Sequence, residues 1–338
     1  MLYPGETVLL HIPGTIPSLA MLQLMATGYD QASHKKITAV PKLIIIDDSL
    51  LFDIGESPVP DLLRIIEKVP GMPKQTFIVP FAMIFMEDFE DVCRKFCSEN
   101  SERSIVDLNE VSINHHDLVG MARSTFEGMS TASAREDVHR SLHSKILHYF
   151  AKILDSTKIM LSETSLDLAS RLLTSVSVGR GPNIPHETNY LDTRLPGIMF
   201  LNSMREFTPK ECAFYLQRLD ISPITVVNFS TLLDPIVGSV NVLSETFISG
   251  LQRGFSSTVS TVMRTAAKIE AVENSSGNCQ LCFLPLSKNL VESFSDLKLC
   301  SGNYCIGCNI VMTECGSNSL QNVQRISARN VLDEYLVE

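Results

Sequence analysis

The chain has 338 residues, of which 44% are hydrophobic and 20% charged, and its formal net charge is -10. This length allows two domains with sizeable cores, and the acidic balance argues against a protein that coats nucleic acid through its own cationic surface. No apolar run approaches the roughly 18 to 20 residues of a membrane span, and the first residues lack the basic region of a signal peptide. We therefore expect a cytoplasmic protein that crosses no membrane.

Apolar runs and helical patterns alternate through the N-terminal part of the chain. TVLLHI at 7–12 and KLIIID at 42–47 predict buried strands, and SLAMLQLMATG at 18–28 predicts a helix between them. A second helix is predicted at 59–69 and a third strand, QTFIVPF, at 75–81. Repeated strand, helix, strand order predicts an α/β fold with a parallel sheet, whose ligand site lies at the carboxyl ends of the strands.

The loop between the first predicted strand and helix reads PGTIPS and runs from Pro13 to Ser18. A phosphate-binding loop needs glycines, because backbone N–H groups must approach the ligand closely, and prolines lack that donor. Pro17 instead suits the first turn of a helix. We predict that Gly14 and Ser18, with Asp47 after the second strand, are the remains of a nucleotide site that no longer works as one.

The middle of the chain begins with a polar stretch. Residues 98–130 are rich in Ser, Asn, Glu and Gly, which predicts a long connection with one short strand. From 133 to 154 apolar residues recur at helical spacing, which predicts a long helix packed on the sheet. This helix also carries basic side chains, including Arg140 and Lys145, so it is a candidate for contacts with phosphate groups such as those of a nucleic acid.

Two further segments combine structural signals with basic residues. KIMLSE at 158–163 predicts a fourth strand, and the helix after it ends at a Gly-Arg-Gly sequence centred on Arg180. There Arg180 either holds a phosphate or carboxylate or is simply part of a helix terminator. TPKE at 208–211 predicts a capping box with proline at the first helical position. Just ahead of it, Arg205 either pairs with Glu206 or contacts substrate.

The C-terminal third differs in pattern from the rest. Residues 220–243 read as irregular, and 244–272 read as one long amphipathic helix. We therefore predict a sheet-containing domain at 1–243 and a module at 244–338 that holds the long helix and a cluster of cysteines.

Nine cysteines in a chain without a signal peptide indicate metal thiolates and free thiols rather than disulfides. Two CxxC turns with four thiolates complete a tetrahedral zinc site, which stabilises a small loop-rich segment. An iron–sulfur cluster is the alternative to zinc, and Cys300 and Cys315 lie close enough to replace a ligand. The two predicted pairs, 22 residues apart, are Cys279 with Cys282 and Cys305 with Cys308.

The apolar strand, the Gly-containing loop, the LAML helix and IIIDD resemble the start of the PP-loop ATP pyrophosphatase fold. Three segments and the paired CxxC module narrow this to a resemblance to the cytoplasmic tRNA 2-thiolation protein 2 family. The resemblance implies a Rossmann-like PP-loop sheet with flanking helices and a small C-terminal zinc module. It implies no catalytic residue here, because the SGGxDS-type loop of active relatives is lost. The segments are REDVHRSLHSKIL at 135–147, LASRLLTSVSVGRG at 168–181 and SMREFTPKECAFY at 203–215.

The resemblance also implies a function. It is 2-thiolation of the tRNA wobble uridine U34, in which this chain is the non-catalytic partner in a heterodimer with a homologous thiolase subunit. In that family the active subunit uses ATP and takes sulfur from a ubiquitin-like carrier, and the tRNAs are those for Lys, Glu and Gln. ATP is not expected on this chain. Two alternatives stay open: a free-standing zinc-ribbon adaptor, or an ATP-dependent tRNA sulfurtransferase with Cys93, Cys97 or Cys212 as sulfur acceptor.

Overall fold

The computed structural model describes residues 2–29, 38–51, 57–72, 75–181, 184–195, 197–222, 238–270, 275–287 and 303–328. The chain forms two compact units, each assembled from three separate stretches. The division predicted at residue 243 follows chain order, whereas each observed unit draws on distant stretches. The first unit comprises Met1–Ala122, Lys145–Thr164 and Gly197–Val227, and the second Arg123–Ser144, Ser165–Pro196 and Asn228–Glu338.

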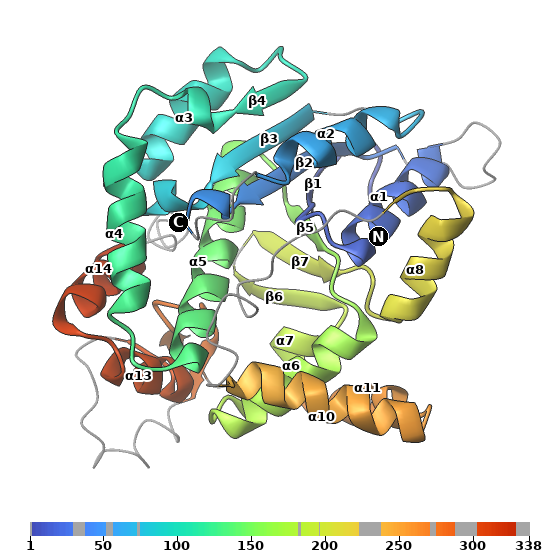
Figure 1. Ribbon diagram of the computed structural model, residues 1–338, viewed down its shortest axis with the longest axis vertical. Coiled ribbons are helices and arrows are strands. Elements are labelled where there is room, and N and C mark those ends of the chain that lie inside the picture. Colours follow the sequence, from blue (N-terminus) through green and yellow to red (C-terminus); the bar gives the residue numbers. More distant parts are fainter. Residues whose placement is uncertain are drawn as a thin grey trace. The chain divides into compact units, whose positions relative to one another are not determined.

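The main sheet has seven strands in the order β4-β3-β2-β1-β5-β7-β6 (Figure 1). Neighbouring strands from β4 to β7 pair in parallel. Parallel strands buried on both faces read as continuous apolar runs, and the strands predicted from such runs are confirmed. The strands are β1 Thr7–His11, β2 Val40–Asp47, β3 Gln75–Pro80, β4 Ile105–Asp107, β5 Lys158–Leu161, β6 Leu191–Leu195 and β7 Ile198–Asn202.

Three helices pack on one face of the first unit's strands: α1 Ile16–Tyr29, α2 Val59–Lys68 and α8 Pro209–Arg218. Leu10 of β1 stands opposite Leu43 of β2 and Met160 of β5, and all three side chains join this core. Alternate side chains of a strand point to opposite faces, so the residues between them serve the other face.

The opposite face is covered by α3 Phe89–Glu99 and by the C-terminal half of α5 Ala132–Ile153. Ring contacts fix this layer. The Phe150 ring centroid lies 6.4 Å from that of Phe77 on β3 and 6.4 Å from that of Phe89, which in turn lies 5.6 Å from that of Tyr149. The predicted α/β architecture with helices on both faces is confirmed. The helix predicted at 133–154 is likewise present.

The start of α8 confirms the predicted capping box. The Glu211 backbone N–H donates to the Thr208 hydroxyl at 3.3 Å, and the Glu211 carboxylate accepts from the Thr208 N–H at 2.7 Å. Pro209 occupies the first helical position, where its missing N–H costs no intrahelical bond.

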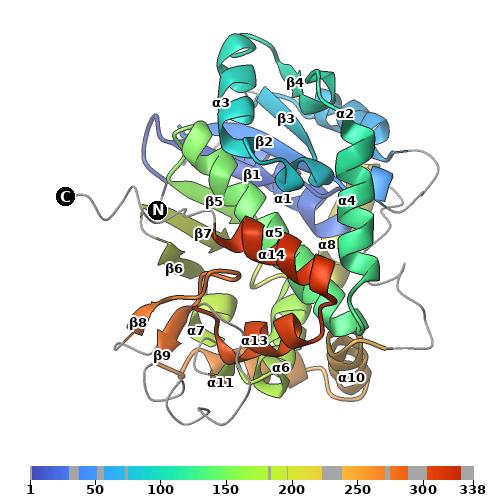
Figure 2. The ribbon, with the colours of Figure 1, turned by 90° about the vertical axis from the view of Figure 1, so that its left-hand side faces the viewer.

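The second unit contains helices and a small hairpin. Its apolar cluster joins Leu168 and Ala169 of α6 to Ile248 of α10 and to Val259 and Met263 of α11. Figure 2 shows α13 and α14 together with the hairpin strands β8 and β9. The elements are α6 Ser165–Ser177, α7 Ile184–Thr188, α10 Val240–Gly254, α11 Thr258–Ala266, β8 Ser275–Asn278, β9 Pro285–Ser287, α13 Ile306–Thr313 and α14 Ser317–Ala328.

Two predictions about helices are wrong. The single helix expected at 244–272 is divided, because Phe255 takes an extended conformation after Gly254, a weak helix former. The Gln252 side chain bridges the break by accepting from the Val259 N–H and donating to the Ser256 carbonyl. The stretch expected to be a connection at 98–130 contains, besides the short strand β4, the helix α4 His115–Glu127.

Within the described ranges, every helix is too short or too polar to cross a bilayer.

Candidate functional site

The loop after β1 leads into α1 much as its sequence predicts. Gly14 has a φ of +83°, a left-handed conformation that a side chain would strain. Pro17 lies in the first turn of α1, and the buried Ser18 hydroxyl donates to the Thr15 carbonyl at 2.8 Å. The hydroxyl that would face a phosphate in a working loop therefore holds the helix start together.

The carboxylate of Asp47, at the end of β2, also forms hydrogen bonds within the chain. It accepts from the Ser49 N–H at 2.9 Å and from the Ser57 hydroxyl at 2.9 Å. These bonds fix the start of the segment that follows β2. With two prolines in the neighbouring loop, few backbone donors are left there for a phosphate.

The first CxxC turn is built around Cys279. Its N–H donates to the Leu284 carbonyl at 2.8 Å, and its carbonyl accepts from the Phe283 N–H at 2.9 Å. Phe283 adopts a φ of +61°, which closes the turn. Arg194 donates to the carbonyl of Cys282 at 3.2 Å, so a side chain from another stretch holds this turn.

The second CxxC turn coincides with the start of α13. Cys305 is the N-cap residue, and its sulfur accepts from the Cys308 N–H at 3.5 Å. Its carbonyl accepts from the Asn309 N–H at 2.8 Å. A hydrogen bond of 2.8 Å from the Gln280 N–H to the Asn303 carbonyl joins the two turns.

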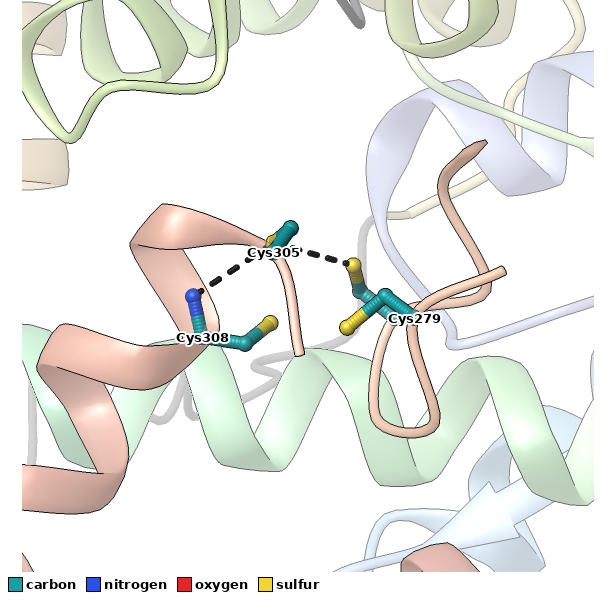
Figure 3. Close-up of side chains that lie close together, drawn as sticks. Cys279, Cys305 and Cys308 are labelled. Atoms are coloured by element: carbon teal, nitrogen blue, oxygen red, sulfur yellow. Dashed lines mark hydrogen bonds between the residues drawn. The ribbon is translucent and has the colours of Figure 1, made fainter. Parts of the chain in front are cut away.

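The sulfurs of the four predicted ligands lie within 4.8 Å of one another, with Cys282 and Cys305 only 3.7 Å apart. Figure 3 shows the side chains of Cys279, Cys305 and Cys308 turned toward a common centre. One ion at 2.3 Å from four tetrahedral sulfurs would hold them about 3.8 Å apart. In a [4Fe–4S] cluster each cysteine binds a different iron, which separates the sulfurs further. The four-cysteine cluster therefore fits a single metal ion.

The four thiols of the cluster affect one another unequally: hydrogen bonds with their neighbours raise the pKa values of Cys282 and Cys308 well above the usual range. Hydrogen bonds from the neighbouring thiols lower the pKa of Cys305 well below its usual range, and the nearby guanidinium of Arg180 lowers it further. Burial alone would lower the pKa of Arg180, but the carboxylate of Asp137 and the cluster thiols raise it well above its usual value. A cation is thus fixed beside the thiolates that a metal ion requires.

The two alternative ligands lie elsewhere. The half-buried Cys315 donates its S–H to the Val311 carbonyl at 3.3 Å and is not a member of the four-cysteine cluster. Cys300 lies outside the described residues.

Of the basic residues predicted to contact phosphate, two are buried: Arg180 is 3% exposed and Lys145 is fully enclosed. Arg140 keeps 31% of its side chain exposed and pairs with Asp137. Arg205 pairs with Glu206, the ion pair that the sequence offered as one alternative. Of these four residues, Arg140 has the most exposed side chain.

The cysteines considered as sulfur acceptors are also enclosed. Cys93, Cys97 and Cys212 are at most 5% exposed. Burial raises the pKa of Cys93 and raises that of Cys97 to about 12. A sulfur acceptor must be an accessible thiolate, so these side chains are unsuited to that role as they stand.

The fold is similar to that of a solved structure. A search of solved structures matches a U34-tRNA thiolase, NcsA from Methanococcus maripaludis with its [4Fe-4S] cluster, with a TM-score of 0.52 and 13% sequence identity. The match covers 90% of this chain and 85% of that chain. The chain therefore has the fold of PP-loop thiolases, a parallel sheet with flanking helices.

The sequence comparisons show a likeness to one family. Residues 239–332 match the family model of the cytoplasmic tRNA 2-thiolation protein 2. Proteins of that name from Xenopus tropicalis and Danio rerio are 27% and 25% identical over 87% and 80% of this chain. The chain is thus similar to the cytoplasmic tRNA 2-thiolation protein 2 family, and the resemblance predicted from its sequence is confirmed. It spans 66% and 59% of the length of these two relatives.

Proposed function

We propose that this chain takes part in 2-thiolation of the tRNA wobble uridine U34 in the cytoplasm, as the non-catalytic partner of a homologous thiolase. The observation that carries the proposal is the loop from Pro13 to Ser18, which joins β1 to α1 in a thiolase fold but has prolines at two of its positions. The relatives are named for cytoplasmic tRNA 2-thiolation, which supports the pathway and the compartment.

In this proposal the chemistry resides in the partner. The catalytic homologue binds ATP, activates U34 and receives sulfur from a ubiquitin-like carrier, and the substrates are tRNAs for Lys, Glu and Gln. This chain contributes a scaffold and, through Arg140, a basic surface beside the RNA. An ATP-dependent sulfurtransferase acting alone is disfavoured, because Cys93, Cys97 and Cys212 are buried.

We also propose that the ion at the four-cysteine cluster is zinc. Thiolates suit zinc in tetrahedral sites, and four protein ligands leave no open position for catalysis. Zinc would be held by the four sulfurs and would supply folding energy to the segment that contains them.

The purified chain is expected to bind no ATP measurably in titration calorimetry. The physical reason is that Pro13 and Pro17 offer no N–H to a phosphate and the Ser18 hydroxyl is bonded to Thr15. The catalytic homologue, titrated under the same conditions, is the positive control. Micromolar affinity for ATP in this chain alone would contradict the non-catalytic assignment.

The decisive experiment removes the chain from cells and measures wobble thiolation of the three tRNAs by mass spectrometry. We expect thiolation to be lost, and to return with either the wild-type chain or its Ser18→Ala variant, because Ser18 has no catalytic task here. The corresponding loop change in the homologue should abolish thiolation. Co-purification of the two proteins tests the heterodimer. Normal thiolation without this chain, or failure of a stably folded Ser18→Ala variant to restore it, would overturn the proposal.

A further inference from the structure

Arg180 enters the interior of the second unit directly after α6. Gly179 has a φ of +75°, and this left-handed residue reverses the chain so that the Arg180 N–H donates to the Ser175 carbonyl at 2.7 Å. The side chain of Arg180 is only 3% exposed. Burying a guanidinium costs free energy unless the group is paired, so the partners of Arg180 indicate its role.

Those partners are a carboxylate and a metal-site sulfur. One terminal nitrogen of Arg180 lies 3.1 Å from the Asp137 carboxylate and donates to the sulfur of Cys308 at 3.6 Å. Asp137 is also paired with Arg140. Burial would raise the pKa of Asp137, but Arg180 and Arg140 hold it below its usual range, so the carboxylate stays ionised as an anchor.

The space for this guanidinium depends on a glycine inside the second CxxC turn. A side chain at Gly307 would place its Cβ 2.5 Å from the Nε of Arg180 and 3.0 Å from its Cγ. Carbon and nitrogen cannot approach so closely, so the buried Arg180 side chain would have to shift. Gly307 and Arg180 therefore fit together, although 126 positions separate them in the chain.

We propose that Arg180, anchored by Asp137, is a positioning residue of the four-cysteine metal site. It donates a hydrogen bond to the metal-bound thiolate of Cys308 and offsets part of its charge. A divalent ion with four thiolates carries a net charge of -2, which is unfavourable in a buried site without nearby donors. This inference rests on the proposed metal binding and adds to it the residues outside the four ligands that set the affinity.

Arg194 provides an internal comparison. It too pairs with an aspartate, Asp192, but it donates to the backbone carbonyl of Cys282 rather than to a sulfur. A change at Arg194 should therefore disturb the turn without removing a hydrogen bond from a thiolate. Comparing variants at Arg180 with variants at Arg194 therefore distinguishes an effect on the metal–sulfur bond from an effect on the fold.

The test measures zinc affinity of the full chain by competition with a chromophoric chelator, and records the sulfur-to-cobalt charge-transfer band after Co²⁺ substitution. Arg180→Gln and Gly307→Ala are each expected to weaken zinc binding about 10- to 100-fold. Both should shift the cobalt band to lower energy, because the thiolate becomes a stronger donor when its hydrogen bond is lost. Arg180→Lys retains a positive charge for Asp137 and should keep the fold, with a smaller loss.

Two variants serve as controls. Gly181→Ala adds a methyl group that no described residue, apart from the chain neighbours, approaches within 4 Å, and the variant should bind zinc as the wild type does. Arg194→Lys should leave the cobalt band in place. Wild-type affinity and an unchanged cobalt band in both Arg180→Gln and Gly307→Ala would overturn the role of Arg180 while leaving metal binding intact. A wild-type chain that binds neither zinc nor cobalt would overturn the metal site and this inference together.

Discussion

Replacing Cys279 and Cys305 by serine together is expected to reduce bound zinc from about one ion per chain to none. Each substitution removes one thiolate from a different CxxC turn, and a site with two remaining sulfurs binds zinc poorly. Structural zinc contributes on the order of 10 to 16 kcal/mol to the folding of small zinc-binding domains, so its loss should destabilise the segment around the cysteines. Metal analysis by mass spectrometry measures the loss.

The same variant should lose local structure as well as metal. We expect rapid proteolytic cleavage within residues 275–287 and 303–328 and unchanged protection of the sheet in the first unit. Cys212→Ser is the matched control, because Cys212 is a buried cysteine that packs in the core of the first unit and lies outside the four-cysteine cluster. A full equivalent of zinc in the double variant would contradict the assigned ligands.

Acid is expected to destabilise the first unit through His148, by roughly 3 kcal/mol between pH 6.5 and pH 4. His148 lies on α5 and is 1% exposed; burial lowers its pKa to about 4, and the nearby Lys152 and Lys145 add to the effect. The unfolded chain binds the proton near pH 6.5 and the folded chain only near pH 4. The stability from a neutral His148 is therefore complete above pH 6.5 and falls as the pH decreases toward 4.

Chemical denaturation at a series of pH values checks this expectation. Carboxylates titrate in the same range, so the informative quantity is the difference between the wild type and His148→Leu. The stability of the variant should fall less steeply between pH 6.5 and pH 4. His116→Leu, a change at an exposed position of α4, should follow the wild-type curve. Parallel curves for the wild type and His148→Leu would show that the unfolding free energy does not depend on protonation of this side chain.

The central strands could be predicted because they are buried and therefore consist largely of consecutive apolar residues. β1 and β2 are covered on both faces, so their inner positions, Val8 to Leu10 and Leu43 to Ile46, are all apolar. β6 was not predicted, because it contains Asp192 and Arg194 and lies at the end of the strand order, where alternating polar residues are tolerated. The helix α4 was not predicted either, because its sequence is polar, although Ala122 and Phe126 within it are buried.

The candidate site likewise contains some residues that could be predicted from the sequence and others that could not. The four cysteines could be predicted because two close CxxC pairs with a suitable gap have the spacing of a metal site. The residues that support them could not, because Asp137, Arg180 and Arg194 come from stretches more than 80 positions away from the nearest cysteine ligand. Arg180 looked equally like a helix terminator or an anion-binding residue, and only the folded chain brings it to Cys308.

The interleaving of the two units limits how the protein can be shortened. Each unit collects three stretches of chain, and α4 and α5 contribute to both. Cutting after Val227 retains every stretch of the first unit but leaves two pieces of the second without their companions. No single truncation isolates either half intact, so domain deletion is the wrong tool for this protein and individual side-chain replacements are the right one.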